Sequence, residues 1–253
     1  MLRDMKKREF ASLLALGLAP WLLLDPRPAG AQESGADWGE GWDLEERVAA
    51  VNDGELRFVA PEAAAGHHVH VNRIHIDASS LRTGWVTLEQ CHDQLDAVPA
   101  AQILFNPERI RHLRVQSAED IGRAWMEGSS VQLEDVGRRA RLCVTGESRA
   151  LSDLGQGRYR LQNGPYMRRF LDGYYPMRVE LEIRYPAESL RFVAPLPAPQ
   201  LGFEVHRREG EIVVEATFEG RLYTCMDFLG AGHVGDPGPP PPCPTDQGTV
   251  PAQ

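Results

Sequence analysis

Four of the eight histidines in this chain of 253 residues lie within the segment HHVHVNRIH, residues 67–75. In an extended strand, residues two positions apart point to the same side, and each residue advances the chain by about 3.3 Å. His68 and His70 would then lean toward one ion, whereas His67 and His75 would face the other way. Imidazole nitrogens are common ligands of Cu(II), Zn(II) and Ni(II). The segment therefore predicts a copper or zinc site with candidate ligands His68, His70, His67 and His75.

Two imidazoles do not complete a metal site, so a third ligand has to come from another part of the chain. The candidates are His92, Asp77 and His206, provided that they lie on a neighbouring strand.

Two other interpretations of the histidine segment stay open. In one, His68 and His70 face water on a strand whose Val69 and Val71 face the core. In the other, several imidazoles with pKa values near 6.5 titrate together and make the surface sensitive to pH.

Catalytic motifs do not support an enzyme. The chain contains no GxSxG, HExxH, GxGxxG or P-loop sequence, the patterns that announce common catalytic and phosphate-binding sites. Cys91 and His92 are adjacent, but neighbours on a strand point to opposite faces and cannot act as a nucleophile and its base. The sequence favours a binding protein and leaves enzymatic activity open.

A second candidate site lies in residues 163–176, where aromatic and arginine side chains alternate with glycine and proline. Aromatic residues with arginine are typical of protein-interaction hot spots. We expect contact residues at Tyr166, Arg168, Arg169, Tyr174 and Tyr175. The alternative function is thus a structural or protein-interaction module of the cell envelope; the same segment would otherwise only anchor a long connection to the core.

All four cysteines lie after residue 90, and none is spaced as CxxC. An even number of cysteines in an oxidising compartment favours disulfides. Of the three possible pairings, we expect Cys91 with Cys143 and Cys225 with Cys243.

The first 31 residues have the order of a secretory signal. Basic residues at 6–8 precede an apolar run over residues 11–24, and small residues follow at 28–31. This order predicts cleavage before Gln32 and a periplasmic or secreted protein without a membrane span. The segment Lys7-Arg8-Glu9-Phe10 also resembles a twin-arginine signal with lysine in the first position, so the export route stays open.

Charge limits the partners of the protein. The chain has a formal net charge of −9, and the part after the first 31 residues has no cluster of lysine and arginine. A nucleic acid or an anionic membrane is therefore not expected as a partner. A metal ion or an envelope protein fits this composition better.

The elements that must position these residues are mostly strands. Apolar and charged residues alternate over 177–184 and 212–219, and shorter runs of the same kind fill much of residues 56–228. Alternation predicts strands with one buried face, here in a mainly β, antiparallel β-sandwich-like fold. One or two short helices are expected, over 43–52 and 118–126.

An internal repeat suggests two related modules. The hexamer LRFVAP occurs at residues 56–61 and again at 190–195, each copy thirty residues before a cysteine. We therefore expect a signal peptide over 1–31, a flexible leader over 32–43, β-rich modules over 44–150 and 151–230, and a proline-rich tail over 231–253.

Overall fold

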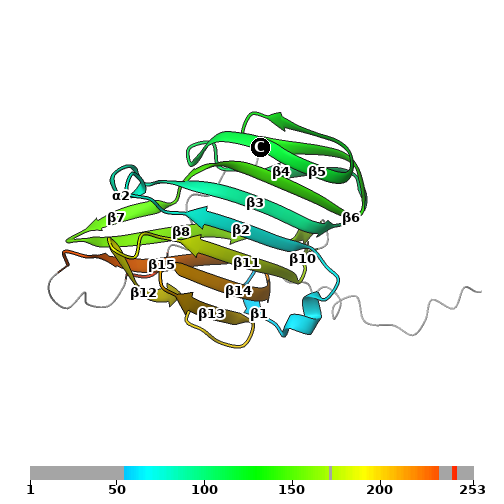
Figure 1. The fold of residues 1–253 in the computed structure, drawn as a ribbon. Coiled ribbons are helices and arrows are strands. Elements are labelled where there is room, and N and C mark those ends of the chain that lie inside the picture. The colour runs from blue at the N-terminus through cyan, green and yellow to red at the C-terminus, as the bar shows by residue number, and fades with distance from the viewer. Residues whose placement is uncertain (1–53, 171–172, 234–240, 244–253) are drawn as a thin grey trace, which may run out of the picture. The chain divides into compact units, whose positions relative to one another are not determined.

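The computed structural model describes residues 54–170, 173–233 and 241–243. Strands dominate these residues, which confirms the mainly β prediction (Figure 1). The elements in chain order are β1 (Arg57–Phe58), η1 (Pro61–Ala64), β2 (Val69–His75), α2 (Ser80–Thr83), β3 (Trp85–Leu95), β4 (Val98–Leu104), β5 (Ile110–Glu127), β6 (Ser130–Arg149), β7 (Leu151–Gly155), β8 (Arg158–Tyr166), β9 (Arg169–Phe170), β10 (Gly173–Tyr174), β11 (Met177–Arg184), β12 (Leu190–Leu196), β13 (Phe203–Arg208), β14 (Glu211–Glu219) and β15 (Leu222–Gly230).

The strands form a nine-stranded sheet, a four-stranded sheet and the small β9–β10 pair. In the large sheet the order is β1-β14-β11-β2-β3-β6-β4, with β13 beside β14 and β5 beside β6. The smaller sheet has the order β12-β15-β8-β7. The pairs within these sheets are antiparallel except β2 with β11, which is parallel.

The main core contains side chains from both sheets. The alternation predicted for β11 is present, since its apolar side chains are buried while its charged ones are partly exposed. Leu181 of β11 and Val214 of β14 belong to one buried cluster with Leu161 and Phe228 of the smaller sheet. Burial of apolar side chains from both sheets stabilises the fold as a sandwich.

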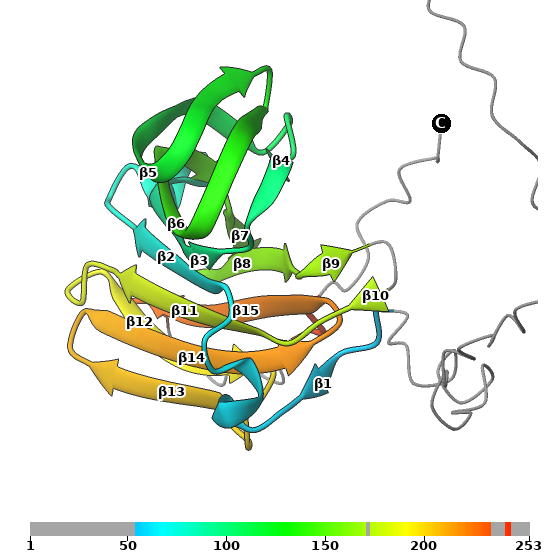
Figure 2. The same cartoon turned by 90° about the vertical axis from the view of Figure 1, so that its right-hand side faces the viewer.

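A second core lies where β4, β5 and β6 meet. Strands β5 and β6 form a long hairpin, and β4 pairs with the same β6. Val131, Leu133 and Leu142 of β6 are buried there, with Ile103 of β4 and Ile121 of β5 packed against them. In Figure 2 these three strands, in green, rise above the remaining strands.

The helix expected over residues 118–126 is wrong. These residues belong to β5 and pair with β6, from Ala118 opposite Leu142 to Met126 opposite Val131. Local helix preference is weak, and pairing with a long neighbouring strand overrides it. The short helices observed are η1 and α2, and neither of them is long and apolar enough to span a membrane.

Several expectations fall outside the described residues: the signal peptide, the leader, the helix over 43–52 and most of the tail.

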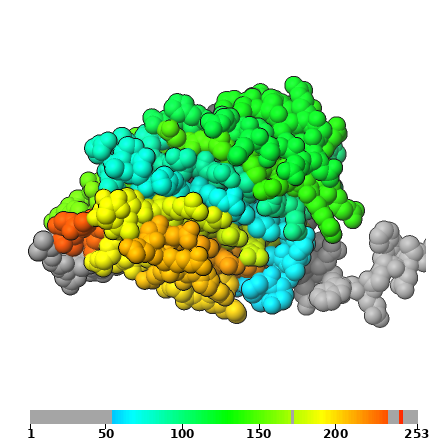
Figure 3. Space-filling view, in the orientation of Figure 1, coloured from blue at the N-terminus to red at the C-terminus, as the bar shows by residue number. Residues whose placement is uncertain are grey.

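The two expected modules share one sheet. Strand β2 of the first pairs with β11 of the second, and β1 pairs with β14. In Figure 3 the cyan residues of the first module adjoin the yellow and orange residues of the second. The module boundary at residue 150 stays a prediction.

Both expected disulfides are present. Cys91 and Cys143 face each other across β3 and β6 and are bonded, and Cys225 of β15 is bonded to Cys243. Arg160 reinforces the second connection, because it pairs with Asp227 and also donates hydrogen bonds to the carbonyl oxygens of residues 241 and 242. The short proline segment around Cys243 is thus held against the smaller sheet.

We expect removal of either disulfide to destabilise the protein, mainly because the unfolded chain becomes less constrained. The cysteines are 52 and 18 residues apart in sequence. For loops of these lengths the expected losses are about 4 and about 3 kcal/mol in the free energy of unfolding. Urea unfolding of the double variants Cys91→Ala/Cys143→Ala and Cys225→Ala/Cys243→Ala measures both losses. An unchanged midpoint in either variant would contradict this expectation.

Candidate metal centre

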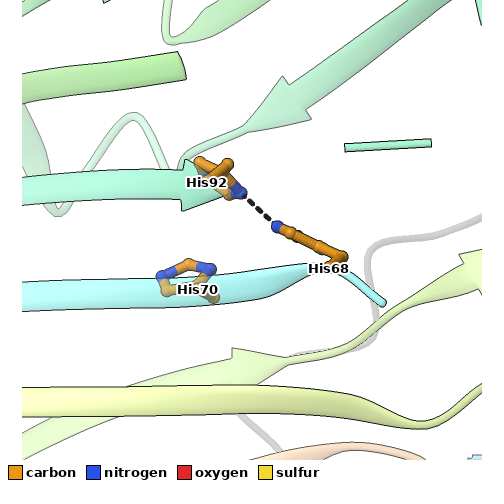
Figure 4. A group of neighbouring side chains, drawn as sticks. All are labelled: His68, His70 and His92. Carbon is orange, nitrogen blue, oxygen red and sulfur yellow. Dashed lines mark hydrogen bonds between the residues drawn. The ribbon is translucent and has the colours of Figure 1, made fainter. Parts of the chain in front are cut away.

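Two neighbouring strands bring three histidines together. In the antiparallel ladder of β2 and β3, His70 lies directly opposite His92. His68 precedes β2 and lies two positions from His70, so strand alternation directs both to one side. The ligand nitrogens of His68, His70 and His92 all lie within 4.8 Å of one another. Figure 4 shows His68 reaching toward His92, with His70 beside them. The cluster could hold a metal ion.

The spacing within the cluster is close to that of a metal site. His68 Nε2 lies 3.0 Å from His92 Nδ1, and the two rings are stacked with centroids 5.1 Å apart. The His70 ring meets the His92 ring edge-on at 4.6 Å. Donor nitrogens of a tetrahedral zinc ion, each at 2.0–2.1 Å from the metal, are about 3.3 Å apart. The separation of the His68 and His92 nitrogens is close to this value, and all three ligand nitrogens lie within 4.8 Å of one another.

Burial keeps the three imidazoles uncharged. It lowers the pKa of His68 to about 4, against the opposing influence of Asp96. It lowers the pKa of His70 to about 3, helped by the neighbouring His68. The pKa of His92 is also well below its usual range, again because of burial and the two other histidines. At neutral pH each ring is then the neutral imidazole, which is the form that can bind a metal.

Side-chain amides orient two of the rings. His70 Nε2 lies 3.1 Å from Asn72 Oδ1, and Asn72 Nδ2 donates to the Tyr166 hydroxyl at 2.7 Å. The amide oxygen is an acceptor, so His70 carries its proton on Nε2 and presents the lone pair of Nδ1. Burial raises the pKa of Tyr166, which keeps the phenol neutral. On the other strand, Gln90 Nε2 lies 2.7 Å from His92 Nε2.

The structure separates the histidines that the sequence groups together. His68 and His70 lie in the cluster, whereas His67 and His75 are exposed and outside it. Of the candidates for a third ligand, His92 is in the cluster. The interpretation in which His70 faces water is wrong, because that side chain is only 7% exposed.

The other two candidates for a third ligand have local partners of their own. Asp77 accepts hydrogen bonds from the hydroxyls of Ser79 and Ser80. His206 lies 3.6 Å from Glu204. The choice of His92 as the third member of the cluster depends on the pairing of residues 70 and 92 in neighbouring strands. A single sequence does not show such pairing.

The expected interaction residues lie in different surroundings. Tyr166 is only 6% exposed and belongs to the hydrogen-bond chain around His70. Arg168 pairs with Asp96 at 2.8 Å, and its side chain is 10% exposed. Arg169 is exposed, with its guanidinium 5.6 Å from the Tyr174 ring centroid, and Tyr174 and Tyr175 are partly buried. Tyr166 and Arg168 therefore border the histidine cluster, and the role of all five residues as partner contacts stays a prediction.

No protein-family model and no curated protein matches the chain. Among solved structures, it is similar to an M1 zinc metallopeptidase variant from Deinococcus radiodurans bound to a Tyr-Ser-Ala substrate, at 13% identity and a TM-score of 0.34. That match covers 64% of this chain and 41% of the other. A two-domain M1 zinc metallopeptidase variant bound to L-tryptophan matches at 14% identity and a TM-score of 0.34, covering 71% and 44%. The chain thus spans less than half the length of either protein.

We expect the stability of the metal-free protein to fall as the pH decreases from about 6.5 to about 4. The buried histidines resist protonation in the fold, whereas in the unfolded chain they take up protons below about pH 6.5. Each histidine that stays neutral in the fold should lower the free energy of unfolding by up to about 1.4 kcal/mol for each pH unit in this window.

Urea unfolding with chelator at pH 7, 6 and 5 tests this expectation on the wild type, His70→Gln and His75→Gln. Replacing the buried His70 should flatten the dependence, and replacing the exposed His75 should leave it unchanged. Identical slopes in all three proteins would show that the cluster is not the cause.

Proposed function

We propose that this protein binds a transition-metal ion, zinc or copper, through His68, His70 and His92. One observation carries the proposal. The ligand nitrogens of the three histidines lie within 4.8 Å of one another, and burial lowers the pKa of each ring. Burying three polar rings beside one another costs free energy. A bound ion would offset that cost by coordinating all three lone pairs.

The donor set fits zinc and copper better than harder ions. Imidazole nitrogen is a good ligand for Zn(II) and Cu(II), whereas Mg²⁺ and Ca²⁺ prefer oxygen. Three protein nitrogens also leave a coordination position open, as in metal sites that accept a water or a further ligand. The open position would face the cavity that His68, His70 and His92 line.

The amides around the cluster support the same proposal. A ligating histidine usually donates its second ring N–H to a carbonyl or carboxylate, which fixes the orientation of the ring. Asn72 Oδ1 is placed to accept that hydrogen from His70. A metal on His92 Nδ1 would move the ring proton to Nε2, and rotation of the Gln90 amide would then present its oxygen to accept it.

The proposed place of action is the periplasm or the exterior of the cell. Two disulfides indicate an oxidising, extracytoplasmic compartment. The signal-like first 31 residues support export. In such a compartment a site made only of nitrogen ligands has no free thiol to be oxidised.

We expect the purified protein to bind one zinc or copper ion. His68→Ala, His70→Ala and His92→Ala should each weaken binding by more than the 10- to 100-fold that changes beyond the direct ligands usually cost. His67→Ala and His75→Ala are matched controls, because these exposed histidines lie outside the cluster. Calorimetric titration of the chelator-treated proteins with Zn(II) and Cu(II) measures the affinities. Equal affinities in the cluster variants and the controls would refute the proposal.

Asn72 should contribute to affinity through the orientation of His70. Asn72→Ala removes the acceptor and should weaken zinc binding about 10- to 100-fold. Asn72→Asp keeps an acceptor oxygen toward His70 Nε2 and should restore most of the affinity. If both variants lose affinity equally, the residue acts through folding and not through this hydrogen bond; melting curves without metal provide the comparison.

A further inference from the structure

The histidine cluster lines part of a cavity of about 690 Å³. Small-molecule sites usually have volumes of about 300–1,000 Å³, mostly apolar walls and a few polar groups that fix the orientation of the ligand. A metal ion alone needs far less space. The cavity therefore has room for a further occupant beside the cluster.

The floor of the cavity changes in character along two strands. Side chains two positions apart share a face. The cavity is lined by His68, by three residues of β2 and by four of β3, namely His70, Asn72, Ile74, Leu88, Gln90, His92 and Leu95. Between the His70–His92 pair and the Ile74–Leu88 pair, the floor passes from histidines through amides to aliphatic side chains. The four residue steps from His92 to Leu88 span about 13 Å of strand.

Further apolar side chains contribute to the lining. Leu95, Ile103, Phe105 and Leu133 also line the cavity. Leu133 is buried in the core between β4, β5 and β6, and the other three pack against the same cluster. An occupant with a polar head at the histidines would meet aliphatic and aromatic side chains along the rest of its length, together with polar ones such as Gln102, Asn106 and Arg109.

Charge indicates the nature of the polar head. Three neutral imidazoles leave both positive charges of a divalent ion uncompensated by its protein ligands, and an uncompensated charge in a buried site is costly. An anionic oxygen in the open coordination position would reduce this charge and fill the position at once. A carboxylate provides such an oxygen on an apolar chain.

Resting on the proposed metal site, we infer that the cavity binds a medium-chain aliphatic carboxylate. Its carboxylate takes the open position on the ion held by His68, His70 and His92. Its hydrocarbon chain lies over Ile74 and Leu88, under Ile103. The protein is then a metal-dependent binder of aliphatic acids, and binding makes or breaks no covalent bond other than coordination to the ion.

The first test uses the zinc-loaded full mature protein and the probes acetate, hexanoate, decanoate and decanol. Calorimetry should show affinity rising roughly fourfold for each methylene that enters the cavity, which corresponds to about 0.8 kcal/mol per buried CH₂ group. Decanol has the same chain without the anion and should bind more weakly than decanoate. In Co(II)-loaded protein, decanoate should change the visible spectrum of the ion because it enters the coordination sphere.

A matched pair of variants tests the apolar part. Ile103→Gln places an amide in the wall and should weaken decanoate binding at least tenfold while leaving zinc binding unchanged. Leu201→Gln makes the same change at a leucine that is 75% exposed and outside the cavity, and should leave both affinities unchanged. Melting curves show whether either variant is folded; should Ile103→Gln fail to fold, the comparison of acetate with decanoate decides alone.

The outcomes separate this inference from the metal proposal. If zinc binds but acetate and decanoate have equal affinity, the inference is wrong and the metal site stands. If decanoate binds His92→Ala as tightly as the zinc-loaded wild type, its carboxylate does not lie on the ion and the inference is again wrong. If zinc itself does not bind to the wild type, both fail together.

Discussion

The antiparallel register of β2 against β3 is the constraint on which the candidate site depends. It sets His70 opposite His92, and a slip by one residue would turn every side chain of a strand to the other face. Strand β2 is held on its other edge by the parallel pairing with β11, so both of its neighbours fix its position. The Cys91–Cys143 disulfide adds a covalent constraint on the opposite face of β3, one residue from His92. The position of the histidines is therefore set by backbone pairing before any ion binds.

The two faces of strands β2 and β3 differ in the side chains that they bury. Val71, Cys91 and Cys143 form a small apolar cluster on one side of the sheet. On the other side, His70 and His92 are buried without charge. The apolar side and the disulfide contribute stability, which offsets the cost of keeping polar rings away from water. A stable sheet thus holds the histidine nitrogens in a buried position that would be unfavourable in free energy without it.

The sequence was sufficient for the class of the fold, because the alternation in segments such as 177–184 is a local property that burial on one face imposes. It was insufficient for pairing. The parallel contact of β2 with β11 joins residues more than one hundred positions apart, and a hydrogen-bonded ladder leaves no local mark in either strand. For the same reason His68 and His70 could be placed on one face, whereas the choice of His92 over Asp77 and His206 needed the register. The hairpin of β5 and β6 replaces the helix expected over residues 118–126, again through a partner that the local sequence does not show.

The order of side chains along the floor of the cavity argues against a purely structural origin. Ile74 and Leu88 already belong to the main core, and the same faces of β2 and β3 could continue with aliphatic residues toward their other ends. Instead they continue with Asn72 and Gln90 and then with His70 and His92, all four of them buried. Well-packed apolar residues of similar volume would be at least as stable there, because buried polar groups give little net stability even when they are hydrogen-bonded. A polar end of the floor is therefore not required by the packing of the sandwich, and it agrees with the metal site that we propose.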